Sequence, residues 1–467
     1  MATMTHNGNP AGLITDIPVM GFSNKDRPSD DIINTCVHCG LCLPSCPTYR
    51  ETGLEMSSPR GRILLMKSVS EGVIGLDSAV FQEQMSQCLN CRACEAVCPS
   101  GVQYGTILEA SRTQIAQAKV REEEAATPAP QHNIKARPLW QRGLHMVVFD
   151  GLFNDMRLFR TFSGLMSLYQ RTGVQWLARK SGMLKLMGLG EMETMLPSIS
   201  KTFVVPMGQI YRAEGTARYS VALLSGCIMS TAFANVHEAT IRVLQKNGCD
   251  VILPPGQGCC GALHSHSGDL DGSRRLARQN IEAFEGLGVD AIVVNAAGCG
   301  STLKEYNHFL HDDPDWHERA ERFVAKIKDV HEFLTSIELN REGLGELPVS
   351  VTYQEPCHLA HAQRITAQPR TLLKAIPGLQ LREMHESSMC CGSAGVYNIT
   401  QPEMAARLGA RKIENALETN AEVIATGNPG CAIQLASELQ RRGKDVQVRY
   451  IVELLDESYQ RGQAARG

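Results

Sequence analysis

The sequence has no long apolar run, no excess of charge of either sign and few aromatic residues. No segment approaches the ~18 consecutive apolar residues that cross a bilayer, which excludes an integral membrane protein. The 46 basic and 49 acidic side chains give a net charge of −3, so no overall attraction to nucleic acid is expected. Hydrophobic residues make up 43% of the 467, which excludes disordered and collagen-like chains. The length suggests about three domains.

Targeting and nucleotide-binding signals are also missing. The first basic residue is Lys25, so the start of the chain resembles neither a secretory signal nor a twin-arginine signal, and we expect a cytoplasmic protein. No G-x-G-x-x-G follows a predicted strand, and there is no Walker loop and no G-x-S-x-G motif. We therefore expect no flavin or nicotinamide on this chain.

Cysteine, in contrast, is abundant: there are 17, and in a reducing compartment they favour metal binding over disulfides. Two runs share the spacing C-x2-C-x2-C-x3-C-P, which is typical of bacterial ferredoxins with two [4Fe-4S] clusters, where the fourth cysteine of each run binds the other cluster. The spacing therefore predicts one cluster on Cys36, Cys39, Cys42 and Cys98, and a second on Cys88, Cys91, Cys94 and Cys46. A pair of zinc sites is the alternative, but zinc explains neither the third cysteine of each run nor the Cys-Pro that ends it.

Helices are predicted on both sides of the second run. Ser58 and Pro59 are typical of an N-cap and a first helical position, and the apolar pattern continues to Val69. Residues 106–124 form a second helical pattern. Because its connectors are helices, this region resembles the α-helical ferredoxin domain of respiratory iron-sulfur subunits.

A basic segment follows the linker Ala125–Pro130. Between Gln131 and Gly190 there are nine basic and two acidic residues, and apolar residues recur at helical spacing, first around Leu144–Met156 and then from Phe162 to Tyr169. We expect amphipathic basic helices. They would act as a spacer packed on the neighbouring domains, as a docking site for an acidic partner subunit, or as a contact with anionic lipid.

The C-terminal half alternates strands and helices, which favours α/β units with a parallel sheet. In the first unit the pattern predicts strands at 219–225, 250–253 and 291–295 and helices at 235–246 and 274–285. In the second unit it predicts strands at 349–354, 379–383 and 422–425 and helices at 370–375 and 402–418. The order is the same in both, which indicates a duplication.

Eight further cysteines support the duplication. Four belong to each repeat, and equivalent positions lie 130 to 132 residues apart: Cys227, Cys259, Cys260 and Cys299, then Cys357, Cys390, Cys391 and Cys431. Loops at the carboxyl ends of parallel strands are where such folds place their sites, so each repeat is predicted to gather four sulfurs that are candidate ligands of further clusters. Buried structural cysteine or vicinal disulfides are the alternatives.

Several residues near these cysteines have more than one possible role. The histidines are alternative ligands, proton carriers or hydrogen-bonding residues: His264, His266, His358 and His361. Cys249 matches no partner and is expected in the core.

The Cys-Cys-Gly repeat resembles the cysteine-rich (CCG) domain of heterodisulfide reductase. The whole order resembles the iron-sulfur subunits of bacterial glycolate oxidase, through Cys36–Cys42, Ser58–Arg62, Cys94–Val102, Gly258–Ala262 and Cys390–Tyr397. The resemblance implies an oxidoreductase subunit in a hetero-oligomer. FAD-containing partner subunits would oxidise glycolate to glyoxylate, or D-lactate to pyruvate, and this chain would pass the electrons to a quinone or another membrane acceptor on the cytoplasmic face of the inner membrane.

One departure matters. Thr302 and Gln434 stand where the heterodisulfide reductase pattern has a fifth cysteine, which makes heterodisulfide chemistry doubtful. The rival functions are an iron-sulfur subunit of a D-lactate or anaerobic glycerol-3-phosphate dehydrogenase, and a thiol/disulfide enzyme acting at the CCG sites.

The expected fold class is a multidomain α + α/β protein. It comprises an extension (1–30), a helical ferredoxin-type domain with two [4Fe-4S] clusters (31–124), a basic helical connector (125–215), and two cysteine-rich repeats (218–345 and 346–458).

Overall fold

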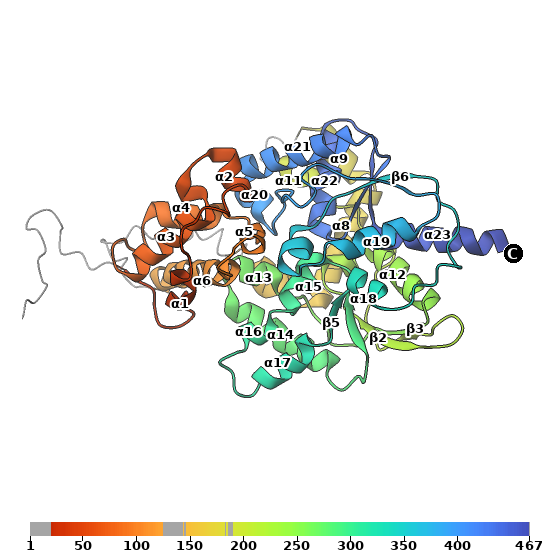
Figure 1. The fold of residues 1–467 in the computed structure, drawn as a ribbon, viewed down its shortest axis with the longest axis horizontal. Coiled ribbons are helices and arrows are strands. Elements are labelled where there is room, and N and C mark those ends of the chain that lie inside the picture. The colour runs from red at the N-terminus through yellow and green to blue at the C-terminus, as the bar shows by residue number, and fades with distance from the viewer. Residues whose placement is uncertain (1–19, 125–142, 144–145, 183, 185–189, 467) are drawn as a thin grey trace, which may run out of the picture.

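The computed structural model describes residues 20–124, 143, 146–182, 184 and 190–466. Helices of the N-terminal region lie at one end of the molecule and the C-terminal helix projects at the other, with the α/β repeats between them (Figure 1). The predicted multidomain α + α/β class is confirmed. Predictions for residues 1–19, the linker Ala125–Pro130 and Leu144 lie outside the described residues, as do four of the basic residues of the connector: Lys135, Arg137, Arg142 and Lys185.

The N-terminal region is helical. Its elements are α1 (Asp30–Asn34), α2 (Pro47–Thr52), η1 (Glu55–Ser57), α3 (Pro59–Ser70), α4 (Ala79–Gln87), α5 (Ala93–Ala96) and α6 (Tyr104–Glu124). As predicted, Ser58 caps α3: its Oγ accepts a hydrogen bond from the Gly61 N–H at 3.1 Å. Buried apolar side chains that include Met66, Phe81 and Leu108 form the core between these helices.

The connector contains η2 (Met146–Leu152), α8 (Met156–Arg171), α9 (Val174–Lys180) and α11 (Gly190–Thr194). The predicted helices are present, but their apolar residues divide between two sides. Met156 and Phe159 pack into the core of the first repeat, whereas Leu165 and Leu168 are 58% and 60% exposed. Part of the connector's apolar face therefore has no cover among the described residues. None of the described helices is long and apolar enough to cross a membrane.

The first repeat is built on a five-stranded sheet in the order β1-β3-β2-β4-β5. The strands are β1 (Ile210–Tyr211), β2 (Tyr219–Leu223), β3 (Cys249–Ile252), β4 (Ala291–Val294) and β5 (Ile327–Asp329). All are parallel except β1. The helices are η3 (Ile228–Ser230), α12 (Ala234–Lys246), α13 (Ala262–His266), α14 (Leu270–Phe284), α15 (Ala297–Leu303), α16 (Tyr306–Phe309), α17 (His317–Val324) and α18 (Val330–Ser336).

The second repeat has a four-stranded parallel sheet in the order β7-β6-β8-β9, which corresponds to β3-β2-β4-β5 of the first. Its strands are β6 (Ser350–Tyr353), β7 (Gln380–Arg382), β8 (Val423–Thr426) and β9 (Gln447–Tyr450). Its helices are η4 (His358–Ala362), α19 (Ala367–Ala375), α20 (Tyr397–Thr400), α21 (Pro402–Glu418), α22 (Pro429–Arg441) and α23 (Ile451–Arg466). The shared strand order confirms the duplication. Cys249 is buried at the start of β3, as expected for a core residue.

The two repeats share one hydrophobic core. Val221 and Leu244 of the first lie in the same buried cluster as Val351 and Leu455 of the second. Helix α23 packs on α12, where the guanidinium of Arg242 binds the carboxylate of Asp456 at 2.8 Å. The repeats therefore form a single rigid support for their sites.

An ion-pair network attaches the N-terminal region to the second repeat. Glu386 accepts from Arg50 of α2 at 2.5 Å and from Arg411 of α21 at 2.7 Å, and Arg411 also reaches Glu51. Hydrogen bonds from Arg411 and then Arg50 outweigh the partial burial of the carboxyl and hold the pKa of Glu386 at about 2. Its contribution to stability is thus complete above its usual pKa of about 4.5 and is lost as the pH falls towards 2.

We expect Glu386→Gln to lower the free energy of unfolding by about 1–3 kcal/mol at neutral pH, because two arginines lose their charged acceptor. Anaerobic denaturant unfolding of the purified chain measures this. Glu418→Gln, at an exposed glutamate at the end of α21, is the matched control and should be silent. Equal effects of the two substitutions would contradict the role of this network.

Candidate iron-sulfur sites

The first cysteine run forms the loop between α1 and α2. The loop turns through backbone conformations with positive φ at His38 and Gly40, and Cys46 is the N-cap residue of α2, with Pro47 at the first helical position. A Cβ on Gly40 would lie 2.7 Å from the guanidinium of Arg60, which donates to the His38 carbonyl at 3.1 Å. The coiled loop therefore needs glycine here both for its φ and for the close approach of Arg60.

The second run joins α4 to α5, with positive φ at Asn90 and Arg92. Its side chains meet those of the first run. Cys98 borders the same small hollow as Cys36, Cys39 and Cys42, and Cys94 also lies on its edge. Burial raises the pKa of Cys94, and the thiols of Cys91, Cys88 and Cys46 raise it further, which places Cys46 beside the second run. The fourth cysteine of each run thus lies near the first three of the other.

A buried cation compensates this concentration of thiols. Arg62 is fully buried, and it donates to the carbonyls of Gln84 at 2.8 Å and Ser57 at 2.7 Å. Its Nη2 has no hydrogen-bond partner among the described residues. Burial lowers the pKa of Arg62, but the charges of Cys88 and other buried groups outweigh it and raise the pKa. A buried, partly unpaired guanidinium is costly unless negative charge lies beside it, so it fits an anionic cluster held by these thiolates.

The four cysteines of the first repeat are brought together at the carboxyl ends of the strands. Cys227 follows β2, the Cys259-Cys260 pair precedes α13, and Cys299 lies in α15. The sulfurs of Cys227 and Cys259 are 3.7 Å apart. The hydrogen bond with Cys259, followed by burial, raises the pKa of Cys227. For Cys260 the hydrogen bond with Cys259 lowers the pKa, but the hydrogen bond with Cys299 and burial outweigh it and raise the pKa. A Cβ on the following Gly261, whose φ is +85°, would crowd Ser273 of α14.

The second repeat gathers its four cysteines in the same way. Cys357 precedes η4, Cys390 and Cys391 precede α20, and Cys431 lies in α22. The thiols of Cys357 and Cys391, with burial, raise the pKa of Cys390, and Cys391 with burial raises the pKa of Cys431, so the four thiols lie close together. All 17 cysteines lie within the described residues and none forms a disulfide.

The two repeats face one another across their sites. The side chain of Asn428 accepts a hydrogen bond from the Gly298 N–H at 3.0 Å and donates to the Cys431 sulfur at 3.6 Å. The Ala297 N–H donates to the carbonyl of Gly427 at 3.0 Å. The loops that carry Cys299 and Cys431 are thereby fixed to each other.

The second ferredoxin run packs directly against the site of the second repeat. Cys91 and Cys390 belong to one buried cluster, against which Cys357 packs, and α5 contacts η4. Burial raises the pKa of Cys91 and the thiol of Cys357 raises it further. Residues more than 260 positions apart in the sequence therefore form adjoining sites.

The two repeats differ in charge. Lys412 of α21 is buried beside the site of the second repeat, where its Nζ donates to the carbonyls of Glu386 at 2.5 Å and Ser387 at 3.2 Å. Burial lowers the pKa of Lys412, and the thiols of Cys391 and Cys390 oppose this. The pKa of Cys391 lies well below its usual value because Cys390 and Cys431 donate hydrogen bonds to it, with Lys412 nearby.

The corresponding residue of the first repeat is neutral. Asn280 lies 132 positions before Lys412, the same interval that separates Ser273 from Ala405, and these two residues pack on the glycines that follow the Cys-Cys pairs. The Asn280 amide donates to the Cys259 carbonyl at 2.8 Å and accepts from the Gly258 N–H at 2.9 Å. Only the second repeat thus places a buried cation at this position, which favours a more anionic occupant there.

The positions of the missing fifth cysteines are occupied by polar side chains that form hydrogen bonds. Thr302 Oγ1 donates to the Gly298 carbonyl at 3.1 Å, and Gln434 Nε2 to the Ala405 carbonyl at 3.4 Å. Both are buried. Four cysteines, not five, are available in each repeat.

The four histidines have hydrogen bonds of their own. His264, His358 and His361 contact the carbonyls of Phe149, Asn90 and Ser388, and His266 Nδ1 contacts the carboxylate of Glu109 at 3.0 Å. The alternative in which they hydrogen-bond rather than bind metal is therefore supported. Sequence reasoning missed Arg62, Lys412, Asn428 and Glu109 as site residues, since no local pattern marks a buried charge that acts across domains.

We expect Lys412→Met to lower the midpoint potential of the redox centre at the second repeat by at least about 59 mV, a tenfold change for one electron, because the reduced and more negative form loses its nearby cation. Redox titration followed by electron paramagnetic resonance measures this. Lys444→Met, which removes an exposed lysine of the same repeat, is the control. Identical potentials in all three proteins would rule out an electrostatic role for Lys412.

Comparisons with known proteins match the same regions of the chain. Family models match a 4Fe-4S dicluster domain at residues 32–102, the linker region of the glycolate oxidase iron-sulfur subunit at 140–196, and a cysteine-rich domain at 221–304 and 351–436. The probable glycolate oxidase iron-sulfur subunit of Bacillus subtilis (strain 168) is 42% identical over 93% of this chain and 96% of its own length. The glycolate oxidase iron-sulfur subunit of Escherichia coli (strain K12) is 31% identical over 93% and 96%. A lactate utilization protein A of an Exiguobacterium strain is 29% identical over 51% of this chain and 97% of its own length. The chain belongs to the family of glycolate oxidase iron-sulfur subunits.

Proposed function

We propose that this chain is the electron-transfer subunit of a complex in which FAD-containing partner subunits oxidise glycolate to glyoxylate, and D-lactate to pyruvate. The observation that carries the proposal is the contact between the second ferredoxin run, at Cys91, and the second repeat, at Cys357 and Cys390. Through this contact the cysteine sites of the first run, the second run and the second repeat adjoin one another. The names of the relatives support the hydroxy-acid substrates.

We assign the first cluster to Cys36, Cys39, Cys42 and Cys98 and the second to Cys88, Cys91, Cys94 and Cys46. When bound, such clusters accept and release one electron at a time. Arg62 supplies positive charge beside Cys46 and Cys88, and Arg60 holds the first loop through the His38 carbonyl. The eight cysteines of the repeats are assigned as ligands of further clusters, and the buried Lys412 supports this for the second repeat.

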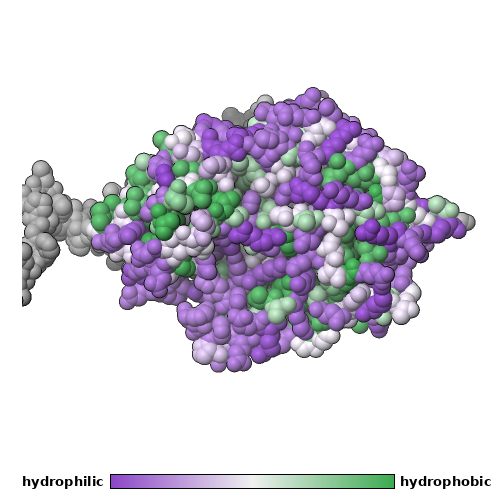
Figure 2. Space-filling view, viewed as in Figure 1, coloured by the Kyte–Doolittle hydropathy of each residue, from purple (hydrophilic) through white to green (hydrophobic). Residues whose placement is uncertain are grey.

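The partner flavin subunits would dock at the first cysteine loop. Cys39 is exposed there, and apolar side chains surround it or lie on the adjacent η1 and α3: Val37, Leu41, Leu54, Met56 and Leu64 are 44–67% exposed. Figure 2 shows apolar surface over this N-terminal end of the molecule. An exposed apolar rim around a redox site is typical of a protein interface.

The acceptor would be a membrane quinone, which requires peripheral contact with the cytoplasmic face of the inner membrane. Helices α8 and α9 suit that contact. They expose Leu158, Leu165, Leu168, Trp176 and Leu177 at 47–62%, and they carry Arg157, Arg171, Arg179 and Lys180. Exposed apolar side chains next to arginine and lysine favour an anionic bilayer surface.

The two surfaces can be tested against each other. Leu165→Gln/Leu168→Gln should weaken binding to anionic lipid vesicles about tenfold or more without weakening co-purification with the flavin subunits. Leu54→Gln/Leu64→Gln should do the reverse. Co-sedimentation and pull-down measure the two properties. If the Leu165→Gln/Leu168→Gln variant binds vesicles normally, the membrane assignment is wrong. If the Leu54→Gln/Leu64→Gln variant still co-purifies with the flavin subunits, the partner face is wrong.

The function itself is tested with the purified complex under anaerobic conditions. Glycolate or D-lactate should bleach the visible absorbance of the clusters, and glycerol 3-phosphate should not. In Cys91→Ser the flavin should still be reduced, while transfer to a quinone-type acceptor should fall about tenfold or more. Bleaching by glycerol 3-phosphate alone, or thiol turnover by this chain without flavin subunits, would favour the rival functions.

A further inference from the structure

A cavity of about 860 Å³ lies where the N-terminal region meets both repeats. Its walls are largely apolar and come from α4, α6, η2, α13 and α20, with Met85, Ile115, Leu263 and Tyr397 among them. Cys88, assigned to the second cluster, also lines it. This size is in the range of small-molecule sites, and the wall that carries Cys88 brings an apolar occupant next to a redox centre.

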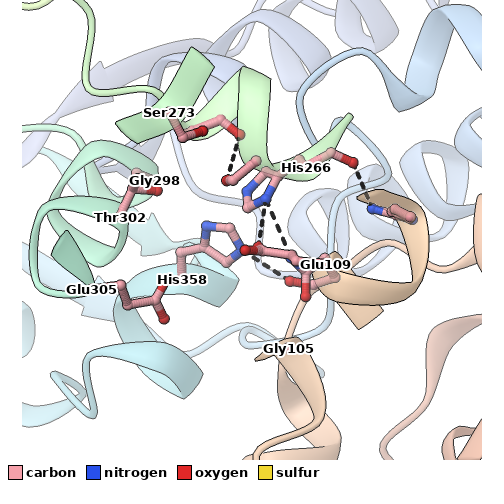
Figure 3. Close-up of polar contacts among 12 residues, drawn as sticks. Gly105, Glu109, His266, Ser273, Gly298, Thr302, Glu305 and His358 are labelled. Carbon is pink, nitrogen blue, oxygen red and sulfur yellow. Dashed lines mark hydrogen bonds and ion pairs between the residues drawn. The ribbon is translucent and has the colours of Figure 1, made fainter. Parts of the chain in front are cut away.

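A histidine–carboxylate pair forms another part of the wall. His266, at the end of α13, lines the cavity, and its Nδ1 is 3.0 Å from Glu109 Oε1 of α6, which also accepts from Asn90 Nδ2 at 2.7 Å. Figure 3 shows His266, His358 and Glu109 pointing toward one another from three different regions of the chain. Asn90 Nδ2 also lies 3.2 Å from His266 Nδ1, but Glu109 is nearer, and because an ionised carboxylate only accepts hydrogen bonds we assign a proton to Nδ1. Its Nε2 has no hydrogen-bond partner among the described residues.

The carboxylate of Glu109 is built to stay ionised. Burial raises its pKa, but the hydrogen bond and charge of His266, the charge of Arg92 and the hydrogen bond of Asn90 outweigh this and hold the pKa at about 2. Arg92 pairs with both Glu109 and Glu305, and Glu109 also pairs with His266. A carboxylate behind Nδ1 fixes the orientation of the ring, and an imidazolium held in this way can donate a proton from Nε2.

The His266–Glu109 pair is fixed in position relative to the loop that carries Cys88 and Cys91. Asn90 lies between Cys88 and Cys91, and its carbonyl accepts from His358 Nε2 at 2.9 Å. Arg112 donates to the carbonyls of Cys88 and of His266, the latter at 3.0 Å. One guanidinium thus fixes the backbone of the cysteine and of the histidine at the same wall of the cavity.

We propose that this cavity binds the headgroup of a quinone and that His266, supported by Glu109, donates a proton to it. The proposal rests on the proposed function, which supplies the electrons. Reduction adds two electrons, released by oxidation of one hydroxy-acid molecule, and two protons. Both C=O groups become C–OH; His266 gives one proton from Nε2, remains neutral with its proton on Nδ1, and is reprotonated from solvent, while water supplies the other proton.

The test uses the intact complex with the flavin subunits and decylubiquinone as the probe. His266→Gln should lower glycolate-driven quinone reduction about 100-fold, because glutamine cannot donate a proton as imidazolium does. Reduction of ferricyanide, which takes an electron without a proton, and the iron content should stay within about twofold of wild type. His311→Gln, at an exposed histidine, is the matched control and should have no effect.

A second variant tests occupancy without catalysis. Leu263→Trp fills the cavity and should raise the dissociation constant for decylubiquinone about tenfold or more, and an azido-quinone should label peptides from the cavity wall in the wild-type complex only. Quinone reduction at wild-type rates in both variants, or labelling elsewhere, would overturn the site while leaving the proposed function intact. If glycolate fails to reduce ferricyanide even in the wild-type complex, the proposed function is what fails.

Discussion

The structure depends on one electrostatic constraint: sixteen cysteine sulfurs in four groups must be held close together, most of them out of water. Thiolates in such an environment repel each other and lose hydration, so a nearby cation stabilises them. Arg62 provides it where the two ferredoxin runs meet, and Lys412 provides it at the second repeat. The first repeat has the neutral Asn280 instead, which makes the two repeats chemically unequal despite their common fold.

The same constraint explains how the regions are assembled. The repeats share a core and meet through Asn428, while the N-terminal region is bound to them by buried or partly buried polar groups and by the small apolar cluster around Cys91 and Cys390. Glu109, Arg92 and Glu305 form the centre of that junction, and Arg50, Glu386 and Arg411 form its edge. Buried charges of this kind fix one relative orientation, because any other arrangement would leave them unpaired. That orientation sets Cys91 against Cys357 and Cys390.

Much of this could be predicted from the sequence because the signals are local. The cysteine spacing, the Ser58–Pro59 helix start and the order of the strands in both repeats depend on nearby residues, and the structure has those elements within a few residues of their predicted bounds. Strands β1, β5 and β9 were not predicted: Ile210–Tyr211 and Ile327–Asp329 are too short to show a pattern, and Gln447–Tyr450 is largely polar. The pairing of Glu109 with His266 could not be predicted either, since the two lie 157 residues apart, and the partners of Lys412 could not because they are backbone carbonyls. The divided apolar face of α8 also required the structure, because periodicity cannot tell which side of a helix is covered.

The central claim is that the two ferredoxin runs exchange their fourth cysteines, so that each cluster belongs to both runs. Electron paramagnetic resonance of the anaerobically reduced complex, recorded for single Cys→Ser variants, tests it most directly. Cys36→Ser and Cys98→Ser should alter one and the same cluster signal, and Cys88→Ser and Cys46→Ser the other. If Cys98→Ser instead altered the signal that Cys88→Ser alters, or if the protein contained zinc and no iron, the account would be contradicted.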